Sequence, residues 1–128
     1  MAKILVIEDM PSVPMSLHKN LAGSGHEVTS ATEGITGLRL IGETLFDLVV
    51  TDIWMPGLNG IDVISRGRAL RPGTRFLAIT GGDPEGRAPA GISGGKDFGA
   101  DGVLFKPFLY AVLLASVASL LSESRLKG

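Results

Sequence analysis

Short, continuous apolar runs recur along this chain, and they limit the folds it can adopt more than any other feature. The clearest are residues 4–7, 48–50 and 76–79. A run of this length without polar alternation is typical of a strand covered on both faces, as in a parallel sheet. The middle run leads to Asp52 and then to a Met-Pro-Gly turn. Asp52 is therefore expected at the carboxyl end of a buried strand.

Strands and helices are predicted to alternate along the whole chain. The expected strands are residues 3–7, 27–31, 46–51, 75–79 and 102–105. The expected helices are residues 12–22, 35–41, 60–70 and 108–125. Short links between alternating strands and helices indicate an α/β fold with a parallel sheet and right-handed crossovers.

One stretch departs from this alternation. A helix is due between the fourth and fifth strands, but glycine and proline dominate residues 81–95, and both oppose helix formation. Only residues 92–98 could form that helix, so a loop with a short helix is expected there. Inward-facing side chains on the preceding helix are expected at Ile61, Ile64 and Val63.

Length and composition argue against several classes of function. The chain has 128 residues, 45% of them hydrophobic, which suits one domain, residues 1–128, with one core and no output domain. A net charge of −1 argues against a nucleic-acid or membrane-surface role. There is no cysteine, the first apolar run is too short for a signal peptide, and no stretch is long enough to span a bilayer. A cytoplasmic protein is expected.

Four of the five predicted strands end on residues that carry chemistry. These residues are Glu8 and Asp9, Asp52, Thr80 and Lys106. In an open parallel sheet, ligands bind outside the carboxyl ends of the strands, where the winding reverses. The five side chains are therefore expected to meet at one site.

The chemistry of these residues favours a hard cation and a phosphoryl group. Three carboxylates without histidine or cysteine suit Mg²⁺, which takes oxygen ligands. Asp52 can act as a nucleophile and form an acyl phosphate, while Lys106 offers a cation and Thr80 a hydroxyl donor. Taken alone, Glu8 and Asp9 are also explained as acids at the start of the following helix, where the helix dipole favours them.

These motifs together resemble the receiver domain of two-component response regulators. The resemblance covers essentially the whole chain, in a stand-alone, chemotaxis-regulator-like form. It is carried by the acidic end of residues 4–9, the Asp-to-Gly run of residues 47–60, Thr80, and the Gly-Ala-Asp-Gly of residues 99–102 that runs on to Lys106-Pro107-Phe108.

The resemblance implies a flavodoxin-like, doubly wound sheet in the order 2-1-3-4-5, with helices on both faces. It implies that Asp52 accepts a phosphoryl group from a sensor histidine kinase or a phosphotransfer protein. Mg²⁺ would be bound by Glu8, Asp9, Asp52 and the backbone carbonyl of Trp54. The Lys106–Pro107 peptide bond would be cis. Such a domain promotes only its own phosphorylation and dephosphorylation, and it regulates a downstream protein that the sequence does not name.

The chain departs from the family pattern at one switch position. Family members usually carry an aromatic residue three positions before the lysine, and here that position is Val103. Phe105 lies two positions further on and is interpreted as a core residue on the same sheet face. The usual aromatic relay is therefore expected to be missing, which leaves open a phosphorylation-independent interaction module. A phosphatase of the haloacid dehalogenase type needs a second Asp two residues after the nucleophile, where this chain has Trp54.

The last predicted helix is apolar over an unusually wide arc. Its leucines and valines cover roughly 200° of the helical wheel, which is wider than a single core contact needs. They are Leu109, Val112, Leu113, Leu114, Val117, Leu120 and Leu121. Burial alone explains part of this stripe, and the remainder suggests a homodimer or partner surface.

Overall fold

A computed structural model describes residues 2–9, 12–55, 57–81, 99–106 and 108–127 of the chain. Its centre is a five-stranded parallel sheet in the order β2-β1-β3-β4-β5, as expected. The strands are β1 (Lys3–Ile7), β2 (Glu27–Ala31), β3 (Leu48–Asp52), β4 (Arg75–Thr80) and β5 (Gly102–Phe105). The reversal of winding between β1 and β3 brings the carboxyl ends of these two strands side by side.

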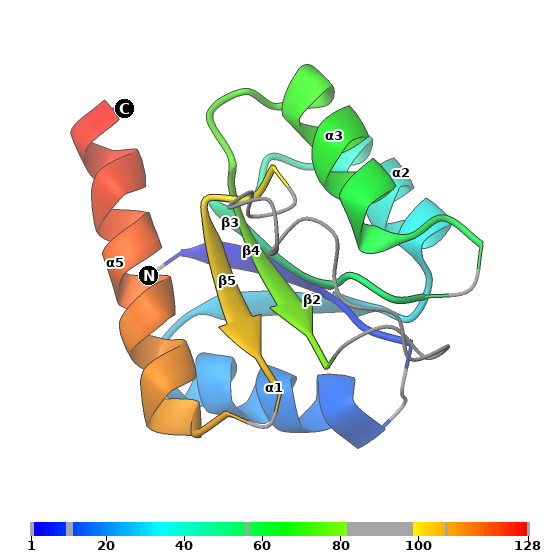
Figure 1. Ribbon diagram of the computed structural model, residues 1–128. Helices are drawn as coiled ribbons and strands as arrows, with labels where there is room; N and C mark the ends of the chain where they lie inside the picture. The colour runs from blue at the N-terminus through cyan, green and yellow to red at the C-terminus, as the bar shows by residue number, and fades with distance from the viewer. Residues whose placement is uncertain (1, 10–11, 56, 82–98, 107, 128) are drawn as a thin grey trace.

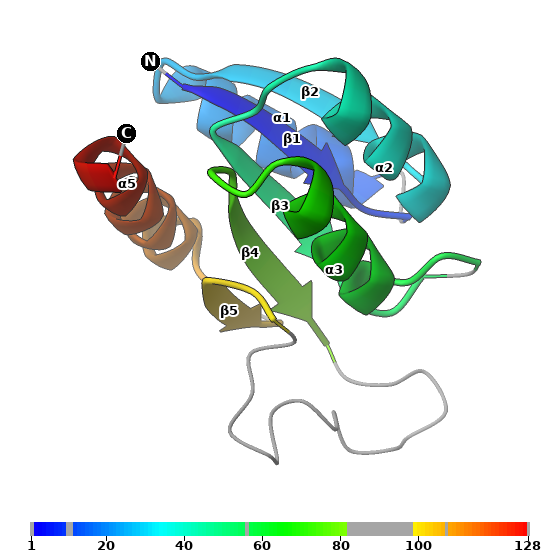
Figure 2. The same ribbon diagram turned by 90° about the horizontal axis from the view of Figure 1, so that it is seen from above.

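Four described helices cover the two faces of the sheet. They are α1 (Ser12–Gly23), α2 (Gly34–Glu43), α3 (Gly60–Leu70) and α5 (Tyr110–Lys127). Helices α1 and α5 pack on one face, and α2 and α3 pack on the other (Figures 1 and 2). Of the loop expected at residues 81–95, only Gly81 is among the described residues. The short helix expected at residues 92–98 lies outside them. The same holds for the Lys106–Pro107 bond, because Pro107 is not described.

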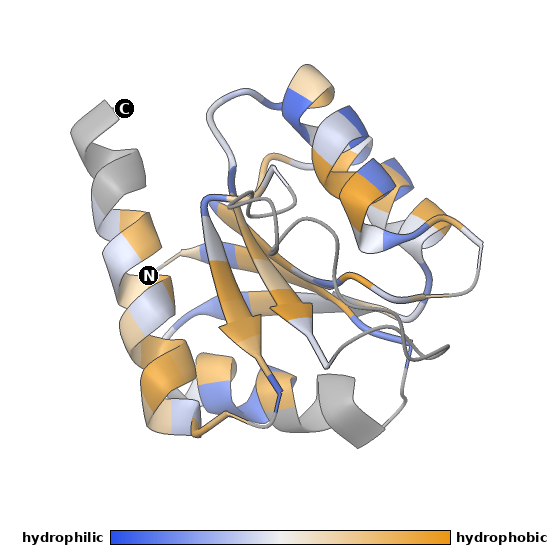
Figure 3. Ribbon diagram, viewed as in Figure 1, coloured by the Kyte–Doolittle hydropathy of each residue, from blue (hydrophilic) through white to orange (hydrophobic). Residues whose placement is uncertain are grey.

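The two cores follow from the period of two along each strand. In β1, Ile4 and Val6 belong to the core under α1 and α5, whereas Leu5 and Ile7 belong to the core under α2 and α3. Strands β3 and β4 are buried at every position, which explains why residues 48–50 and 76–79 are apolar without alternation. Figure 3 shows these apolar residues gathered on the strands.

Some sequence-based boundaries and orientations were wrong. Phe46 was expected to begin the third strand, but β3 begins at Leu48. The carbonyl of Phe46 accepts the Thr74 hydroxyl at 2.7 Å, so a side chain provides its partner in place of a strand neighbour. Ile61 was expected to face inward with Val63 and Ile64, but it is 37% exposed while the other two are fully buried.

Helix α5 divides the wide apolar stripe into a buried and an exposed part. Leu113, Val117, Leu120 and Leu121 are buried against the sheet. Leu109, just before the helix, is 73% exposed, and Val112 is 46% exposed. Figure 3 shows the described part of the helix in orange and pale tones. Among the described residues, no helix is long and apolar enough to cross a membrane.

Gly60, at the start of α3, has a packing constraint that can be tested. A Cβ at this position would meet the backbone carbonyl oxygen of Asp52 and would lie 2.7 Å from Cα of Ile53. Because backbone atoms cannot move aside as a flexible side chain can, we expect Gly60→Ala to lower the free energy of unfolding by about 1–3 kcal/mol. Urea denaturation measures this change.

Gly73→Ala is the matched control, because no atom lies within 4 Å of the Cβ it would add. We expect that variant to unfold at the wild-type urea concentration or slightly above it. A Gly60→Ala protein as stable as Gly73→Ala would contradict the close backbone packing under Asp52.

Candidate phosphoryl and metal site

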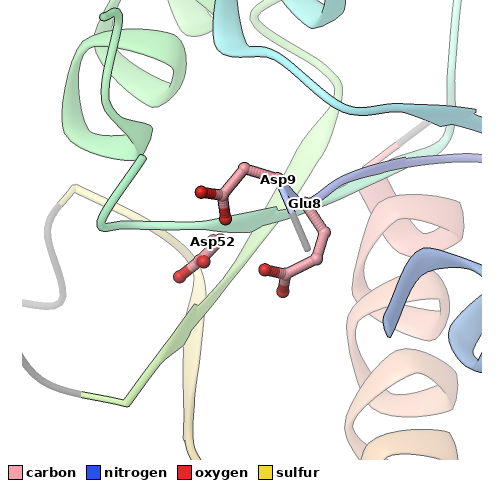
Figure 4. A group of neighbouring side chains, drawn as sticks. All are labelled: Glu8, Asp9 and Asp52. Carbon is pink, nitrogen blue, oxygen red and sulfur yellow. The ribbon is translucent and has the colours of Figure 1, made fainter. Parts of the chain in front are cut away.

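Three carboxylates meet at the carboxyl end of the sheet. Glu8 and Asp9 directly follow β1, and Asp52 is the last residue of the neighbouring strand β3. One oxygen from each of the three lies within 4.8 Å of the others. Figure 4 shows the three side chains around a common space. The sequence-based expectation that these acids converge is confirmed.

Lys106 enters this space from the end of β5. Its Nζ lies 3.1 Å from Oε2 of Glu8 and 3.6 Å from Oδ2 of Asp52. Its backbone N–H donates to the carbonyl oxygen of Thr80 at 2.8 Å, which ties the ends of β5 and β4 together. Thr80 is completely buried. The structure therefore places all five predicted residues at the same edge of the sheet.

Glu8 is the most confined of the acids. It is 1% exposed, and Asp52 is 5% exposed, whereas Asp9 is half-buried. Burial, which is the largest cause, and the neighbouring Asp52 together raise the pKa of Glu8 from 4.5 to about 7, against a smaller lowering by Lys106. Both carboxylate oxygens of Glu8 are buried and accept no hydrogen bond of good geometry.

Opposing effects act on Lys106. Burial lowers its pKa, but the carboxylates of Asp52 and Glu8 outweigh that effect and raise the pKa above its ordinary value. Lys106 is therefore a protonated, positively charged group at neutral pH. Its charge offsets only part of the negative charge of the three acids.

The three carboxylates are suitable ligands for a small, hard cation. Both carboxylate oxygens of Glu8 are buried, and the Lys106 ammonium lies beside Oε2, which leaves lone pairs on this carboxylate that a cation would coordinate. Three carboxylate oxygens within 4.8 Å of one another are close enough that Glu8, Asp9 and Asp52 would bind a single ion. Carboxylates are also the ligand type that Mg²⁺ prefers.

Trp54 was predicted to contribute a backbone carbonyl to the metal, and that role stays a prediction. Its side chain is half-buried and packs against the core under α2 and α3. The indole Nε1 is buried and has no hydrogen-bond acceptor. An unpaired buried donor of this kind generally costs free energy, so the indole ring is held there by its packing.

The switch region of β5 differs from the sequence-based interpretation. Val103 is half-buried against the α2–α3 side, as a strand residue without a ring. Phe105 was interpreted as a core residue, but it is 52% exposed. Phe105 is the last residue of β5, which is an edge strand of the sheet.

Comparison with known families agrees with this geometry. The family model of the response regulator receiver domain matches residues 4–118, which is most of the chain. The chain belongs to this family. Receiver domains serve phosphorelay signalling, and this receiver domain shares their parallel α/β fold.

Similar sequences carry the names of transcriptional regulators. This receiver domain is 38% identical to the probable transcriptional regulatory protein SilR of Salmonella typhimurium, over 98% of its own length and 56% of that protein. It is 36% identical to the transcriptional regulatory protein CusR of Escherichia coli, over 93% of its own length and 51% of that protein. The chain therefore spans about half the length of these curated relatives.

Solved structures show the same architecture. A response regulator receiver domain from Clostridium thermocellum matches with a TM-score of 0.88 and 29% identity, over 100% of both chains. Response regulator TrrA from Thermotoga maritima, solved in complex with Mg²⁺–BeF, matches with a TM-score of 0.81 and 28% identity, over 94% of this chain and 99% of that one.

Sequence reasoning missed the direct pairing of Glu8 with Lys106. Strand ends show which residues share an edge, but not which side chains touch. The available signal was the parallel order itself, since β1 and β5 flank β3 and β4 and the residues directly after them can reach inward.

The raised pKa of Glu8 predicts how stability depends on pH without metal. Because folding raises this pKa from 4.5 to about 7, the folded state binds the proton more tightly than the unfolded state. The resulting stabilisation is fully present below pH 4.5 and is lost as pH rises through 7. We expect the melting temperature in EDTA to fall more between pH 5.5 and 8.0 for the wild type than for Glu8→Gln.

Differential scanning fluorimetry of the two proteins in the same buffers provides the measurement. The difference between wild type and Glu8→Gln removes the contributions of other titrating groups. Parallel curves for the two proteins over this pH range would contradict the assignment of a raised pKa to Glu8.

Proposed function

We propose that this receiver domain accepts a phosphoryl group on Asp52 in a Mg²⁺-dependent reaction and thereby changes conformation for a partner protein. The observation that carries the proposal is the arrangement of Glu8, Asp9 and Asp52 within 4.8 Å, with the ammonium of Lys106 between two of them. Family membership and the likeness to a structure solved with Mg²⁺–BeF support it.

Each residue has a role in the proposed transfer. A carboxylate oxygen of Asp52 attacks phosphorus while the bond from phosphorus to the donor's nitrogen or oxygen breaks, and the leaving group takes that electron pair. Glu8, Asp9, Asp52 and the Trp54 carbonyl would hold Mg²⁺. When bound, the ion offsets the negative charge of the phosphoryl oxygens. Lys106 supplies a second cation, and the Thr80 hydroxyl donates a hydrogen bond to the phosphoryl group.

Lys106 also positions the site for transfer. Its ammonium pairs with both Glu8 and Asp52, and Asp52 is almost fully buried. The cation therefore lies beside the carboxylate that attacks, where it can also face the incoming phosphoryl oxygens.

The partners follow from the same chemistry. We propose a sensor histidine kinase or a phosphotransfer protein as the donor, and an unnamed protein as the target. The near-neutral charge supports a protein target over nucleic acid or a membrane surface. The proposed place of action is the cytoplasm. The similar proteins named as transcriptional regulators are about twice as long, so their activity as whole proteins is not carried over.

In this proposal, the conformational change is passed on without the aromatic residue that family members usually carry before the lysine. Val103 has no ring to rotate, so the change at Thr80 and Lys106 passes to β5 through their backbone hydrogen bond. A module that works without phosphorylation is the rival, and Val103 is the observation that favours it. The intact set of acids, threonine and lysine favours phosphorylation.

We also propose that the exposed part of the α5 stripe contacts a second copy of the chain. Leu109, Tyr110 and Val112 are exposed there, and no charged residue occurs from residue 108 to residue 122. An uncharged surface meets its own copy without like-charge repulsion. We expect Val112→Glu to lower the average mass measured by light scattering at high concentration. A wild type that is monomeric with and without phosphorylation would contradict this contact.

The central proposal is tested by incubation with acetyl phosphate and Mg²⁺ followed by intact-protein mass measurement. We expect one phosphoryl group on the wild type and none on Asp52→Asn. Asp62→Asn is the matched control, because it removes a carboxylate on α3, outside the site. Lys106→Met should slow the reaction by at least about tenfold, because it removes a cation aimed at the transferred group.

EDTA provides a second control, and it should prevent the adduct in the wild type. An adduct that survives Asp52→Asn would refute Asp52 as the acceptor. An adduct that forms equally well in EDTA would refute the role of the metal.

A further inference from the structure

Strand β5 carries Lys106, yet packing specifies its register only weakly. Of its four residues, only Leu104 is buried, whereas β3 and β4 are buried throughout. It is an edge strand, paired with β4 alone among the described strands. Register is normally set by a buried hydrophobic face, and a strand without one is prone to slip. Another interaction must therefore fix β5 along β4.

The position of Lys106 depends on this register. Successive residues of a strand lie about 3.3 Å apart and point to opposite faces. A slip of one residue would turn Lys106 away from the site, and a slip of two would carry it past Glu8 and Asp52. The contacts of Nζ at 3.1 and 3.6 Å would not survive either change.

Asp101, directly before β5, binds β4 through both its backbone and its side chain. Its N–H donates to the carbonyl oxygen of Phe76 at 2.8 Å, and its Oδ2 accepts the N–H of Phe76 at 2.9 Å. Its Oδ1 accepts a hydrogen bond from Nη1 of Arg75 at 3.1 Å. Three bonds thus join one residue to two consecutive residues of β4.

Arg68 of α3 adds a third element to the cluster. Its Nη2 lies 3.0 Å from Oδ2 of Asp101, and its Nε and Nη2 donate to the carbonyl oxygen of Gly99 at 2.9 and 2.7 Å. The guanidinium also lies over the ring of Phe76, 5.5 Å from its centroid. The segment that leads into β5 is therefore bound to α3 as well as to β4.

The electrostatics make Asp101 hard to replace. Arg75 is 8% exposed, and its Nε and Nη2 are buried without hydrogen-bond partners. Asp101 is the carboxylate paired with it. Any other register would leave the buried charge of Arg75 without this partner, at a cost of several kcal/mol. Separating a buried ion pair destabilises a protein strongly even where the intact pair adds little net stability.

We propose that Asp101 is a positioning residue: with Arg68 and Arg75 it fixes the register of β5 against β4 and so sets the reach of Lys106 to Asp52. The assignment rests on the proposed role of Lys106 in phosphorylation. It adds a cluster at the opposite end of β5 from the phosphoryl site, where no residue touches the reacting groups.

The test compares Asp101→Asn in two backgrounds. Asparagine keeps an acceptor for the N–H of Phe76 but removes the charge that pairs with Arg75 and Arg68. With acetyl phosphate and saturating Mg²⁺, we expect phosphorylation about tenfold slower in the wild-type background, since misplacing a catalytic group by 1 Å costs up to about a hundredfold. In the Lys106→Met background we expect no further loss, because Asp101 acts through Lys106.

Arg71→Met is the matched control. Arg71 also binds backbone carbonyls, those of Ile41 and Gly42, but it does not contact β5 or Asp101. We expect its phosphorylation rate to stay at the wild-type value.

Hydrogen exchange gives a readout that does not depend on phosphorylation. In Asp101→Asn, the amide of Lys106, bonded to Thr80, should exchange faster. The amide of Ile53, bonded to Ile79 between β3 and β4, should keep its wild-type protection and serves as the internal reference. If Asp101→Asn does not fold, Arg68→Met, which removes the more exposed partner, is measured in the same way.

Equal loss of rate in both backgrounds, or unchanged protection of the Lys106 amide, would overturn the proposal. Failure of the proposed function looks different. In that case Asp52→Asn would still be phosphorylated, while the exchange of the Lys106 amide would still report whether Asp101 fixes β5.

Discussion

The strongest constraint on this structure is a group of three carboxylates held within 4.8 Å of one another. Like charges at this range repel strongly, and burial of Glu8 removes the water that would weaken the repulsion. Lys106 pairs with Glu8, and burial together with Asp52 raises the pKa of Glu8 to about 7, so both effects reduce the repulsion near neutral pH. The apolar cores on both faces of the sheet supply the stability that keeps these groups together. The site is therefore a strained place in a well-packed scaffold, as functional sites often are.

Much of the fold could be predicted from the sequence because its strongest signals are local. The apolar runs within β1, β3 and β4 indicate strands that are covered on both faces. Strands that alternate with helices along the chain are compatible with only a few sheet topologies. The errors came where tertiary contacts override local pattern. Phe46 has the sequence pattern of a strand residue, but its carbonyl accepts a hydrogen bond from the Thr74 hydroxyl. Phe105 has the pattern of a core residue, but it lies on an edge strand and is half-exposed.

The candidate site could be predicted as a set of residues, but not as a set of contacts. Glu8, Asp9, Asp52, Thr80 and Lys106 were identified because parallel strands end on one edge. The ion pair from Lys106 to Glu8, and the raised pKa that burial gives Glu8, depend on side-chain directions that no linear pattern contains. The Asp101 cluster is hidden for the same reason, since its arginines come from a helix and a strand some 25 to 35 residues earlier.

The close contact of Gly60 with the backbone of Asp52 divides the site into two unequal halves. On one side, Asp52 lies directly over the first turn of α3, where not even a methyl group fits between them, so its backbone cannot recede. On the other side, β5 lies at the edge with half of its last side chain in solvent. A phosphoryl group on Asp52, as proposed, would therefore meet a closely packed α3 side and a less buried β5 side. Of the two, β5 is the element with room to adjust to the added group.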